Sequence, residues 1–333
     1  MWPTRSHFGG KMKRMFTVVT LLVLVMAIEA KAQAPFGSQS VRIIYPFAAG
    51  SAGDTISRLF AEKLQATINQ TVVVENRTGA SGKIGIKAVK VAAPDGNTLL
   101  VTPNGGMTLI PLHDVNAGYD PEADFSPIAQ LVLFDFVIAV ANTVPAKNLN
   151  ELQKWLQANP TKGSYGSPGA GSTLHFVGMK FGMETKLDLQ AVQYRGNTPV
   201  VADLISGQLP MGALALADTL EQHKSGSIRI LGVSSHTRSI FLPEMPTFLE
   251  QGFNVLASGS YSLYAPAKTP TAVIDRLQSI AAETVQAPDV KKRLLSMGFV
   301  PTGTSQGALI KAQREEIEYW KPLVQQSGFK SQD

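Results

Sequence analysis

The chain has 333 residues and no cysteine, so it can form no disulfide, no thiolate metal site and no lipid-modified N-terminal cysteine. Its formal charge is +5, but residues 1–32 hold five basic residues and one acidic residue, which leaves a net charge of +1 on the remainder. That balance argues against a nucleic-acid-binding protein, and about 300 further residues favour two domains.

The first 32 residues predict an export signal. Four basic residues among the first 14 precede an apolar stretch of 13 residues, Phe16 to Ile28, which is shorter than the ~20 residues of a membrane span. Ala30-Lys31-Ala32 then has the small residues of a signal-peptidase site. We predict a signal peptide over residues 1–32, cleavage near Ala32 and Gln33, and a soluble monomer in the periplasm; the alternative is an uncleaved membrane anchor.

From Val41 onward, short apolar strands alternate with amphipathic helices. We expect strands at 41–45, 71–75 and 98–102, a helix at 55–68, and a second helix that ends before the turn Pro94-Asp95-Gly96. This alternation is typical of a parallel sheet with helices on both faces.

A second block of the same kind begins near Phe136. A strand at 136–140 and helices at 150–157 and 173–183 lead into further alternation through 192–194, 199–205, 211–216 and 228–233, and three helices follow at 272–285, 290–297 and 307–326. We therefore predict an α/β protein of two lobes, each a mostly parallel sheet flanked by helices. Lobe 1 comprises residues 33–134 plus 260–333 and lobe 2 residues 135–259, with strands near 128–133 and 261–265 crossing between them.

The loop Ala48 to Asp54 (AAGSAGD) lies between a strand and a helix, where small residues let a ligand approach the main chain. The first N–H groups of a helix have no partner inside it and carry the positive end of its dipole. The loop therefore predicts an anion site, more suited to a carboxylate than to a phosphate ester. The alternative is an ordinary turn with Asp54 as the helix N-cap.

A second loop, Gly163 to Thr173 (GSYGSPGAGST), has the same character and opens a helix in the other lobe. Ser167, Ser172 and Thr173 offer hydroxyl groups, and the stretch Ala170-Gly171-Ser172 offers main-chain N–H groups. Neither loop has Lys or Arg within 48–54 or 164–173, so dipoles would hold the anion. The nearby cations Arg77, Lys83 and Arg195 are expected to be solvated or paired with acids.

Enzyme readings fit the sequence less well. Ser51 lies in AGSAG, close to a nucleophile elbow, and Asp203 or Asp218 followed by His223 or His236 would complete a hydrolase triad. However, Ser51 follows the first strand, whereas a hydrolase sheet places several strands before its nucleophile. The glycines of 79–85 match no nucleotide-binding pattern, and the scattered histidines suggest no metal site or other cofactor.

Several stretches, in their order and spacing, resemble the periplasmic substrate-binding proteins of tripartite tricarboxylate transporters, the Bug-type proteins. The similarity runs from about Val41 to Gly328, and its main stretches are YPFAAGSAGD (45–54), VVVENRTGASG (72–82), APDG (93–96), YGSPGAGS (165–172), YRG (194–196), GQ (207–208), LPEMPT (242–247), EQG (250–252) and AP (265–266). The sequence departs from the family's common pattern at Ala49, Ser51-Ala52, Thr78 and Pro210, which leaves the ligand's identity open.

The resemblance implies a Venus-flytrap fold of the type II periplasmic-binding-protein class that closes over a small organic carboxylate without transforming it. It also implies that the protein delivers this ligand to the membrane subunits of a secondary transporter; a solute sensor for a signalling partner is the alternative. In the family, main-chain donors of the two loops grip one carboxylate. The resemblance further implies that Asn104, Tyr194 and Asp218 occupy positions that in relatives can face the cleft and select the rest of the ligand. The expected ligand-binding residues are Phe47, Ala49, Ser51, Ala52, Gly53, Asp54, Asn104, Ser167, Ala170, Gly171, Ser172, Thr173, Tyr194 and Asp218.

Overall fold

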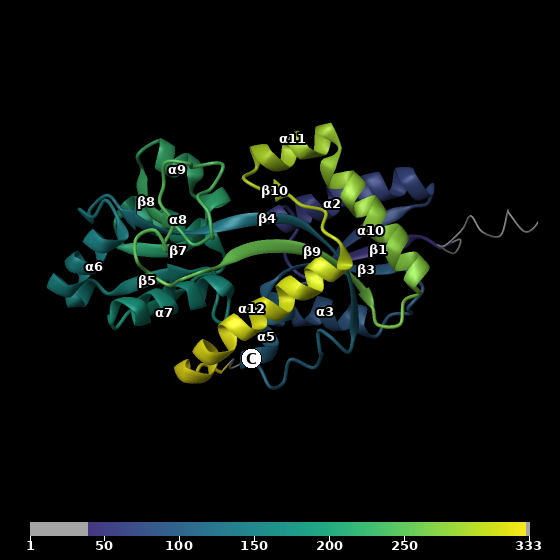
Figure 1. Ribbon diagram of the computed structural model, residues 1–333, viewed down its shortest axis with the longest axis horizontal. Helices are drawn as coiled ribbons and strands as arrows, with labels where there is room; N and C mark the ends of the chain where they lie inside the picture. Colours follow the sequence, from purple (N-terminus) through teal and green to yellow (C-terminus); the bar gives the residue numbers. More distant parts are fainter. Residues whose placement is uncertain (1–38, 331–333) are drawn as a thin grey trace, which may run out of the picture.

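The computed structural model describes residues 39–330, and the predicted export signal lies outside these residues. Two lobes lie side by side, with two strands running between them (Figure 1). Within the described residues, no helix combines the length and the apolar character that crossing a membrane requires.

Lobe 1 contains a parallel sheet in the order β2-β1-β3. Its strands alternate with α2, whose residues Ile56, Leu59, Phe60 and Leu64 are buried against the sheet, and with α3. The bounds are β1 (Val41–Tyr45), α2 (Ala52–Ile68), β2 (Val72–Asn76), α3 (Lys83–Lys90) and β3 (Thr98–Pro103). The helix α2 thus begins three residues earlier than the sequence predicted.

Lobe 2 repeats this arrangement, with β6-β5-β7 paired in parallel. The predicted helices of this block are present, although the boundaries differ by a few residues. The bounds are α6 (Leu149–Ala158), β5 (Ser164–Ser167), α7 (Thr173–Thr185), β6 (Gln190–Gln193), α8 (Asn197–Ser206), β7 (Met211–Ala215), α9 (Leu220–Lys224) and β8 (Ile228–Val233).

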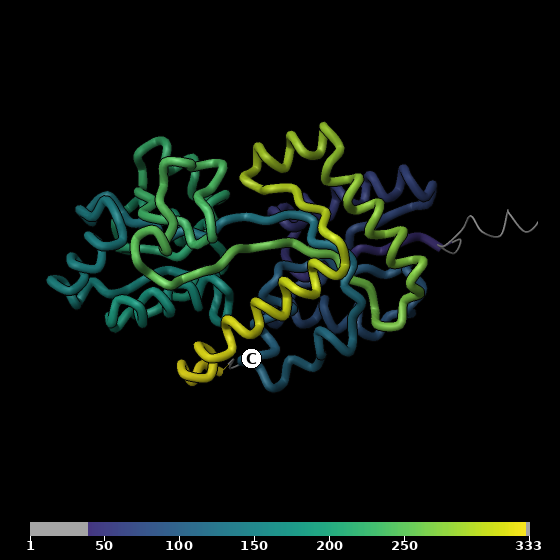
Figure 2. The backbone as a smooth tube through the Cα atoms, in the orientation of Figure 1, coloured from purple at the N-terminus to yellow at the C-terminus, as the bar shows by residue number. Residues whose placement is uncertain are grey.

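The strands predicted to cross between the lobes do so. The 17-residue strand β4 (Phe125–Ala141) pairs first with β9 (Ser258–Pro266) and with β10 (Val300–Pro301), and then with β7 and β8 of lobe 2. All of these pairings are antiparallel, so each lobe combines a parallel part with an antiparallel part at the crossing. Figure 2 shows the two crossing segments as adjacent tubes in the middle of the molecule.

Three helices follow β9: α10 (Thr271–Gln286), α11 (Pro288–Ser296) and α12 (Gln306–Ser327). The last of these runs from lobe 1 toward lobe 2 (Figure 1). At its lobe 1 end, Gln313 approaches Tyr264 and the carbonyl of Met107, and further along Trp320 packs against Phe176 of α7. The C-terminal helix therefore contacts both lobes.

Candidate functional site

The parallel strands of the two lobes end at facing surfaces. Ligands of open α/β sheets bind at the carboxyl ends of strands, which here lie in the loops after β1, β2 and β3 and after β5, β6 and β7. A Cβ atom built on Gly105, next to the end of β3, would lie 2.9 Å from Thr173 Oγ1, and one built on Gly298 would lie 3.1 Å from the Cα of Ala217. We call the loops at these strand ends the interlobe face.

Asp54 organises the first loop of the interlobe face. Its buried carboxylate accepts hydrogen bonds from the backbone of Gly50 at 2.9 Å, from Arg58 at 3.0 Å and from Asn76 at 2.9 Å. Burial raises the pKa of this carboxyl, but the three donors more than offset it and hold the pKa below its ordinary value. Ser51, and not Asp54, is the N-cap of α2, with φ −73° and ψ 166°.

Two tyrosine hydroxyls lie behind the same loop. The Ser51 hydroxyl donates to the carbonyl of Ala48 at 2.9 Å and lies 3.2 Å from the Tyr45 hydroxyl. Burial raises the pKa of both tyrosines, and the backbone of Gly53 lowers the pKa of Tyr261 in part. A Cβ atom on Gly53 would collide with both rings, so glycine is required there. Neither tyrosine was among the predicted ligand-binding residues.

Two main-chain N–H groups of the second loop are already hydrogen-bonded to the loop itself and to the start of α7. The N–H of Gly171 donates to His175 Nδ1 at 3.1 Å, and the N–H of Ser172 donates to the carbonyl of Gly169 at 3.2 Å. Burial lowers the pKa of His175 to about 4, so Nδ1 is an unprotonated acceptor at neutral pH. These two amides, which the sequence offered to a ligand, are therefore engaged inside the loop. The Gly171 carbonyl in turn lies 3.2 Å from His113 Nε2 of lobe 1.

The amides that remain are those of the first helical turns. In α2 these belong to Ala52 and Asp54, and in α7 to Thr173 and Leu174, since such groups have no acceptor within their helix. Ser172 caps α7 by accepting from the His175 N–H. Each lobe thus presents free amides of one of these two helices at the interlobe face, and both helices are longer than three turns.

Asn104 has a full set of internal partners. Its side-chain amide donates to the carbonyl of Ser258 at 3.0 Å and to Glu316 at 2.8 Å, and its oxygen accepts from the N–H of Ser260 at 3.2 Å. These bonds tie the end of β3 to the start of β9 and to α12. The ligand contact that we expected from Asn104 stays a prediction. In the structure, its side chain connects β3, β9 and α12.

Ser167 and Tyr194 are also engaged. The buried Ser167 hydroxyl donates to Gln193 at 2.7 Å, and the Tyr194 hydroxyl donates to Asp203 at 2.6 Å. Burial together with Asp203 raises the pKa of Tyr194 to about 12. The first bond joins the ends of β5 and β6 and the second ties Tyr194 to α8, so a ligand would reach these hydroxyls only by displacing the bonds.

Asp218 differs from these residues because its side chain is exposed. It ends the short 3-10 helix Leu216–Asp218 after β7 and accepts a hydrogen bond from Asn197 at 2.6 Å. Although the residue has exposed surface, the atoms packed around its carboxyl exclude part of the water and raise its pKa. Its charge contributes to the raised pKa of Tyr261 in lobe 1. Asn197, the first residue of α8, was not among the predicted ligand-binding residues. Its side-chain oxygen is buried without a hydrogen-bond partner among the described residues.

The remaining expected residues line the loop edges. Ala49 and Ala170 are exposed, and the partly buried Phe47 packs on Tyr45 with ring centroids 5.7 Å apart. Of the neighbouring cations, Arg77 pairs with Glu75 and Lys83 with Asp114, as expected.

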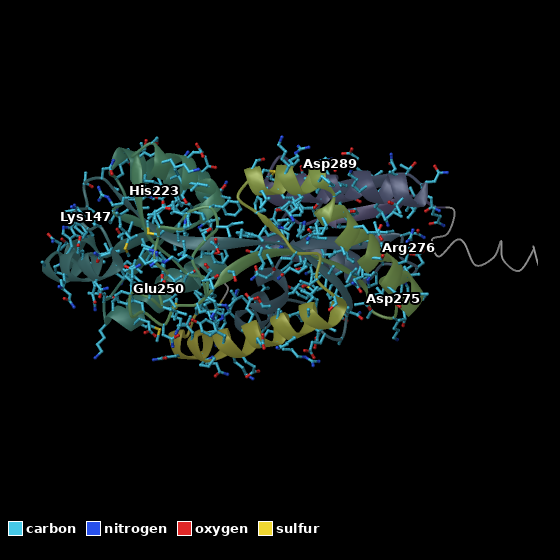
Figure 3. The ribbon with its side chains drawn as sticks, turned by 45° about the horizontal axis from the view of Figure 1, so that its top comes forward. Lys147, His223, Glu250, Asp275, Arg276 and Asp289 are labelled. Carbon is cyan, nitrogen blue, oxygen red and sulfur yellow. The ribbon has the colours of Figure 1, made fainter. Side chains whose placement is uncertain are left out.

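The hydrolase reading finds no support in the geometry. The Ser51 hydroxyl bonds to a carbonyl and a tyrosine, and His223 Nδ1 accepts from the backbone of Ile230 within lobe 2. Figure 3 shows His223 in the same lobe as Lys147 and Glu250, away from the lobe that carries Arg276. Within residues 39–330, no group of three His, Cys, Asp or Glu side chains is placed to hold a metal ion.

The chain matches one protein family over most of its length. The model of the tripartite tricarboxylate transporter family receptors covers residues 56–329. A protein in the tcbD-tcbE intergenic region of Pseudomonas sp. (strain P51) is 29% identical and spans 97% of this chain and 96% of its own. BugT of Bordetella pertussis is 27% identical, over 96% of this chain and 99% of its own.

Solved structures agree with these sequence matches. A structure described as a periplasmic transporter has a TM-score of 0.79 and 33% identity, over 89% of this chain and 99% of its own. Rpa4515 of R. palustris, solved with adipate, has a TM-score of 0.78 and 27% identity, over 87% and 97%. MatC of Rhodopseudomonas palustris, solved with malate, has a TM-score of 0.77 and 25% identity, over 87% and 100%.

Proposed function

Because the chain belongs to the tripartite tricarboxylate transporter family of receptors, we propose that it captures a small organic carboxylate and delivers it to the membrane subunits of such a transporter. As a member it is a periplasmic-type solute-binding receptor and not an enzyme. The adipate and malate in the related structures support a carboxylate as the ligand. We further propose that residues 1–32 direct its export.

The observation that carries this proposal is the pair of helix N-termini at the interlobe face. Their free amides and dipoles attract an anion, and no Lys or Arg lies in either loop. Hydrogen bonds to a charged group contribute roughly 1.5–3 kcal/mol each, so a few of them offset the cost of association and reach about −8 kcal/mol, a micromolar affinity.

The proposed mechanism is closure of the lobes over the ligand. A ligand stabilises the conformation for which it has the higher affinity, and only a closed arrangement brings both helix N-termini around one carboxylate. Binding in this scheme involves no covalent change in the ligand.

Proline substitution at the first helical position tests the amides directly. Ala52 and Thr173 hold this position in α2 and α7, and each follows a serine with ψ near 160°. Proline fits there and removes one N–H donor. We expect Ala52→Pro and Thr173→Pro to weaken carboxylate binding about 10-fold or more, measured by calorimetry with acids found in a thermal-shift screen.

Matched controls separate the amide from the side chain. Thr173→Val removes the hydroxyl and keeps the N–H, and Ala52→Ser keeps the N–H of α2. Melting temperatures within a few degrees of the parent protein would show that the proline variants fold. Unchanged affinity in both folded proline variants, or no response of the parent protein to any organic acid, would contradict the proposed function.

A further inference from the structure

Asp218 is an acid of the interlobe face whose charge is not balanced by a cation. Three other acids near the strand ends are paired with cations, Asp54 with Arg58, Asp114 with Lys83 and Glu75 with Arg77. Two more accept hydrogen bonds from neutral groups of this chain, Glu316 from Asn104 and Asp203 from Tyr194. Within residues 39–330, the partner of Asp218 is the neutral amide of Asn197, and no Lys, Arg or His pairs with it.

The position of Asp218 relates it to the first loop of lobe 1. Ala217, the preceding residue, lies close to Gly298 of lobe 1. The charge of Asp218 also contributes to the raised pKa of the Tyr261 hydroxyl. The Tyr261 ring packs against Gly53 at the N-terminus of α2, where a Cβ atom would lie 2.5 Å from Cε1 of the ring. A carboxylate held by α2 would therefore share the interlobe face with Asp218.

Asn197 adds a second unsatisfied acceptor at the same place. Its Nδ2 donates to Asp218 at 2.6 Å, which directs its buried Oδ1 away from Asp218 and leaves that oxygen without a partner among the described residues. Buried polar atoms nearly always have a partner, so an unpaired one calls for a group that is not in the structure. The Oδ1 of Asn197 can only accept hydrogen bonds, so its missing partner must be a hydrogen-bond donor.

We infer that Asp218 and Asn197 recognise a hydrogen-bond donor at the far end of the ligand. Resting on the proposed function, this inference narrows the ligand to a carboxylate with an ammonium or another N–H or O–H donor at its opposite end. An ammonium is favoured most, because it pairs with the uncompensated charge of Asp218. A second carboxylate is disfavoured, because like charges repel and neither acceptor would be satisfied.

A series of acids that differ only at the end group tests the inference. Butyrate, 4-hydroxybutyrate, 4-aminobutyrate and glutarate carry hydrogen, hydroxyl, ammonium and carboxylate on the same chain, and the corresponding propionates and hexanoates extend the series. At one chain length or more, we expect calorimetry to give the amine at least 10-fold tighter binding than the diacid. Asp218→Asn should lower the affinity for the amine relative to the diacid about 10-fold, so that the two bind equally or the diacid binds more tightly.

Asp188→Asn is the matched control, because Asp188 is an exposed acid of lobe 2 that also bonds to a side-chain amide, that of Gln190 at 2.7 Å. It should leave the ratio unchanged. Equal binding of amine and diacid, or a ratio that Asp218→Asn does not alter, would overturn the inference and leave the proposed function intact. If Asp218 only holds Asn197 in place, Asp218→Asn would lower the melting temperature and keep the ratio. Failure of every acid in the broader screen would instead contradict the proposed function.

Discussion

The carboxylate of Asp54 lies at the tip of a helix that is proposed to attract an anion, and its surroundings resolve this conflict. Arg58 neutralises it, and Gly50 and Asn76 complete its hydrogen bonds. The residue therefore shapes the loop from within, and the ligand would meet the amides that its bonds hold in place.

Asp54→Asn is expected to destabilise the protein by about 1–2 kcal/mol at pH 7, because the ion pair with Arg58 and a buried acceptor are lost. Since the folded-state pKa of Asp54 is lowered, its stabilisation is present above the unfolded pKa near 4 and is lost as the pH falls through the folded value. Urea unfolding at pH 7 and pH 3 should therefore show a difference between variant and parent that shrinks in acid. Asp289→Asn, in an exposed pair with Lys63, is the control and should change stability little. An Asp54→Asn difference that is constant with pH would contradict this explanation.

At the scale of elements, the loop before α7 connects the lobes through its backbone. Gly171 has φ +73°, and its N–H donates to His175. Its carbonyl oxygen contacts the Nε2 of His113 in lobe 1. The aromatic ring of Phe329, just after α12, packs on both histidines with ring centroids 5.2 Å and 5.0 Å apart. The start of α7 is thus held by two distant segments, those of His113 and of Phe329.

Gly171→Ala is expected to cost about 1–2 kcal/mol of stability, because alanine is strained at a positive φ and its Cβ would lie 2.7 Å from the His113 ring. Chemical unfolding measures the loss. Gly169→Ala provides the comparison within the same loop, since its Cβ would meet no atom within 4 Å and its φ is not positive. Equal stability of the two variants would show that the contact with His113 does not constrain the loop.

At the scale of the whole molecule, Glu316 and Asn104 lie where β3, β9 and α12 meet, at the start of a crossing strand. Desolvation raises the pKa of Glu316 to about 7, while hydrogen bonds from Asn104 and Thr108 lower it in part. The nearby Tyr264 has its own pKa raised by burial and by the charge of Glu316. The junction between the lobes therefore contains an acid that is partly protonated at neutral pH.

Because the folded-state pKa of Glu316 lies above its unfolded value of 4.5, its stabilisation is complete below about pH 4.5 and is lost as the pH rises through 7. Glu316→Gln mimics the neutral acid. The variant should therefore have the same free energy of unfolding as the parent protein near pH 5 and a higher one at pH 8. The side chain keeps some contact with solvent, so we expect a gain of about 1–2 kcal/mol, less than the full shift would give. Thermal unfolding between pH 5 and 8 measures it. Glu315→Gln, an exposed neighbour paired with Lys311, should show no such trend; an identical trend in both variants would contradict the assignment.

The sequence by itself determined the elements and their order. Apolar strands alternating with helices at 41–102 and again from 136 onward can bury their apolar faces only in α/β layers, and the two glycine-rich loops necessarily fall at strand ends. The crossing strands were predicted as well, because two blocks of one chain must be joined where the chain leaves and re-enters lobe 1. The resemblance to one receptor family was confirmed over residues 56–329.

Only the tertiary structure decided which polar groups are engaged and which are free. The N–H of Gly171 and the side chain of Asn104 looked available along the chain, but His175 and the residues Ser258, Ser260 and Glu316 occupy them. The charge of Asp218 in lobe 2 contributes to the raised pKa of Tyr261 although 43 positions separate the two residues in sequence. Local periodicity reports which face of an element is apolar, whereas a hydrogen bond or a charge interaction depends on atoms brought together by the packing of distant segments.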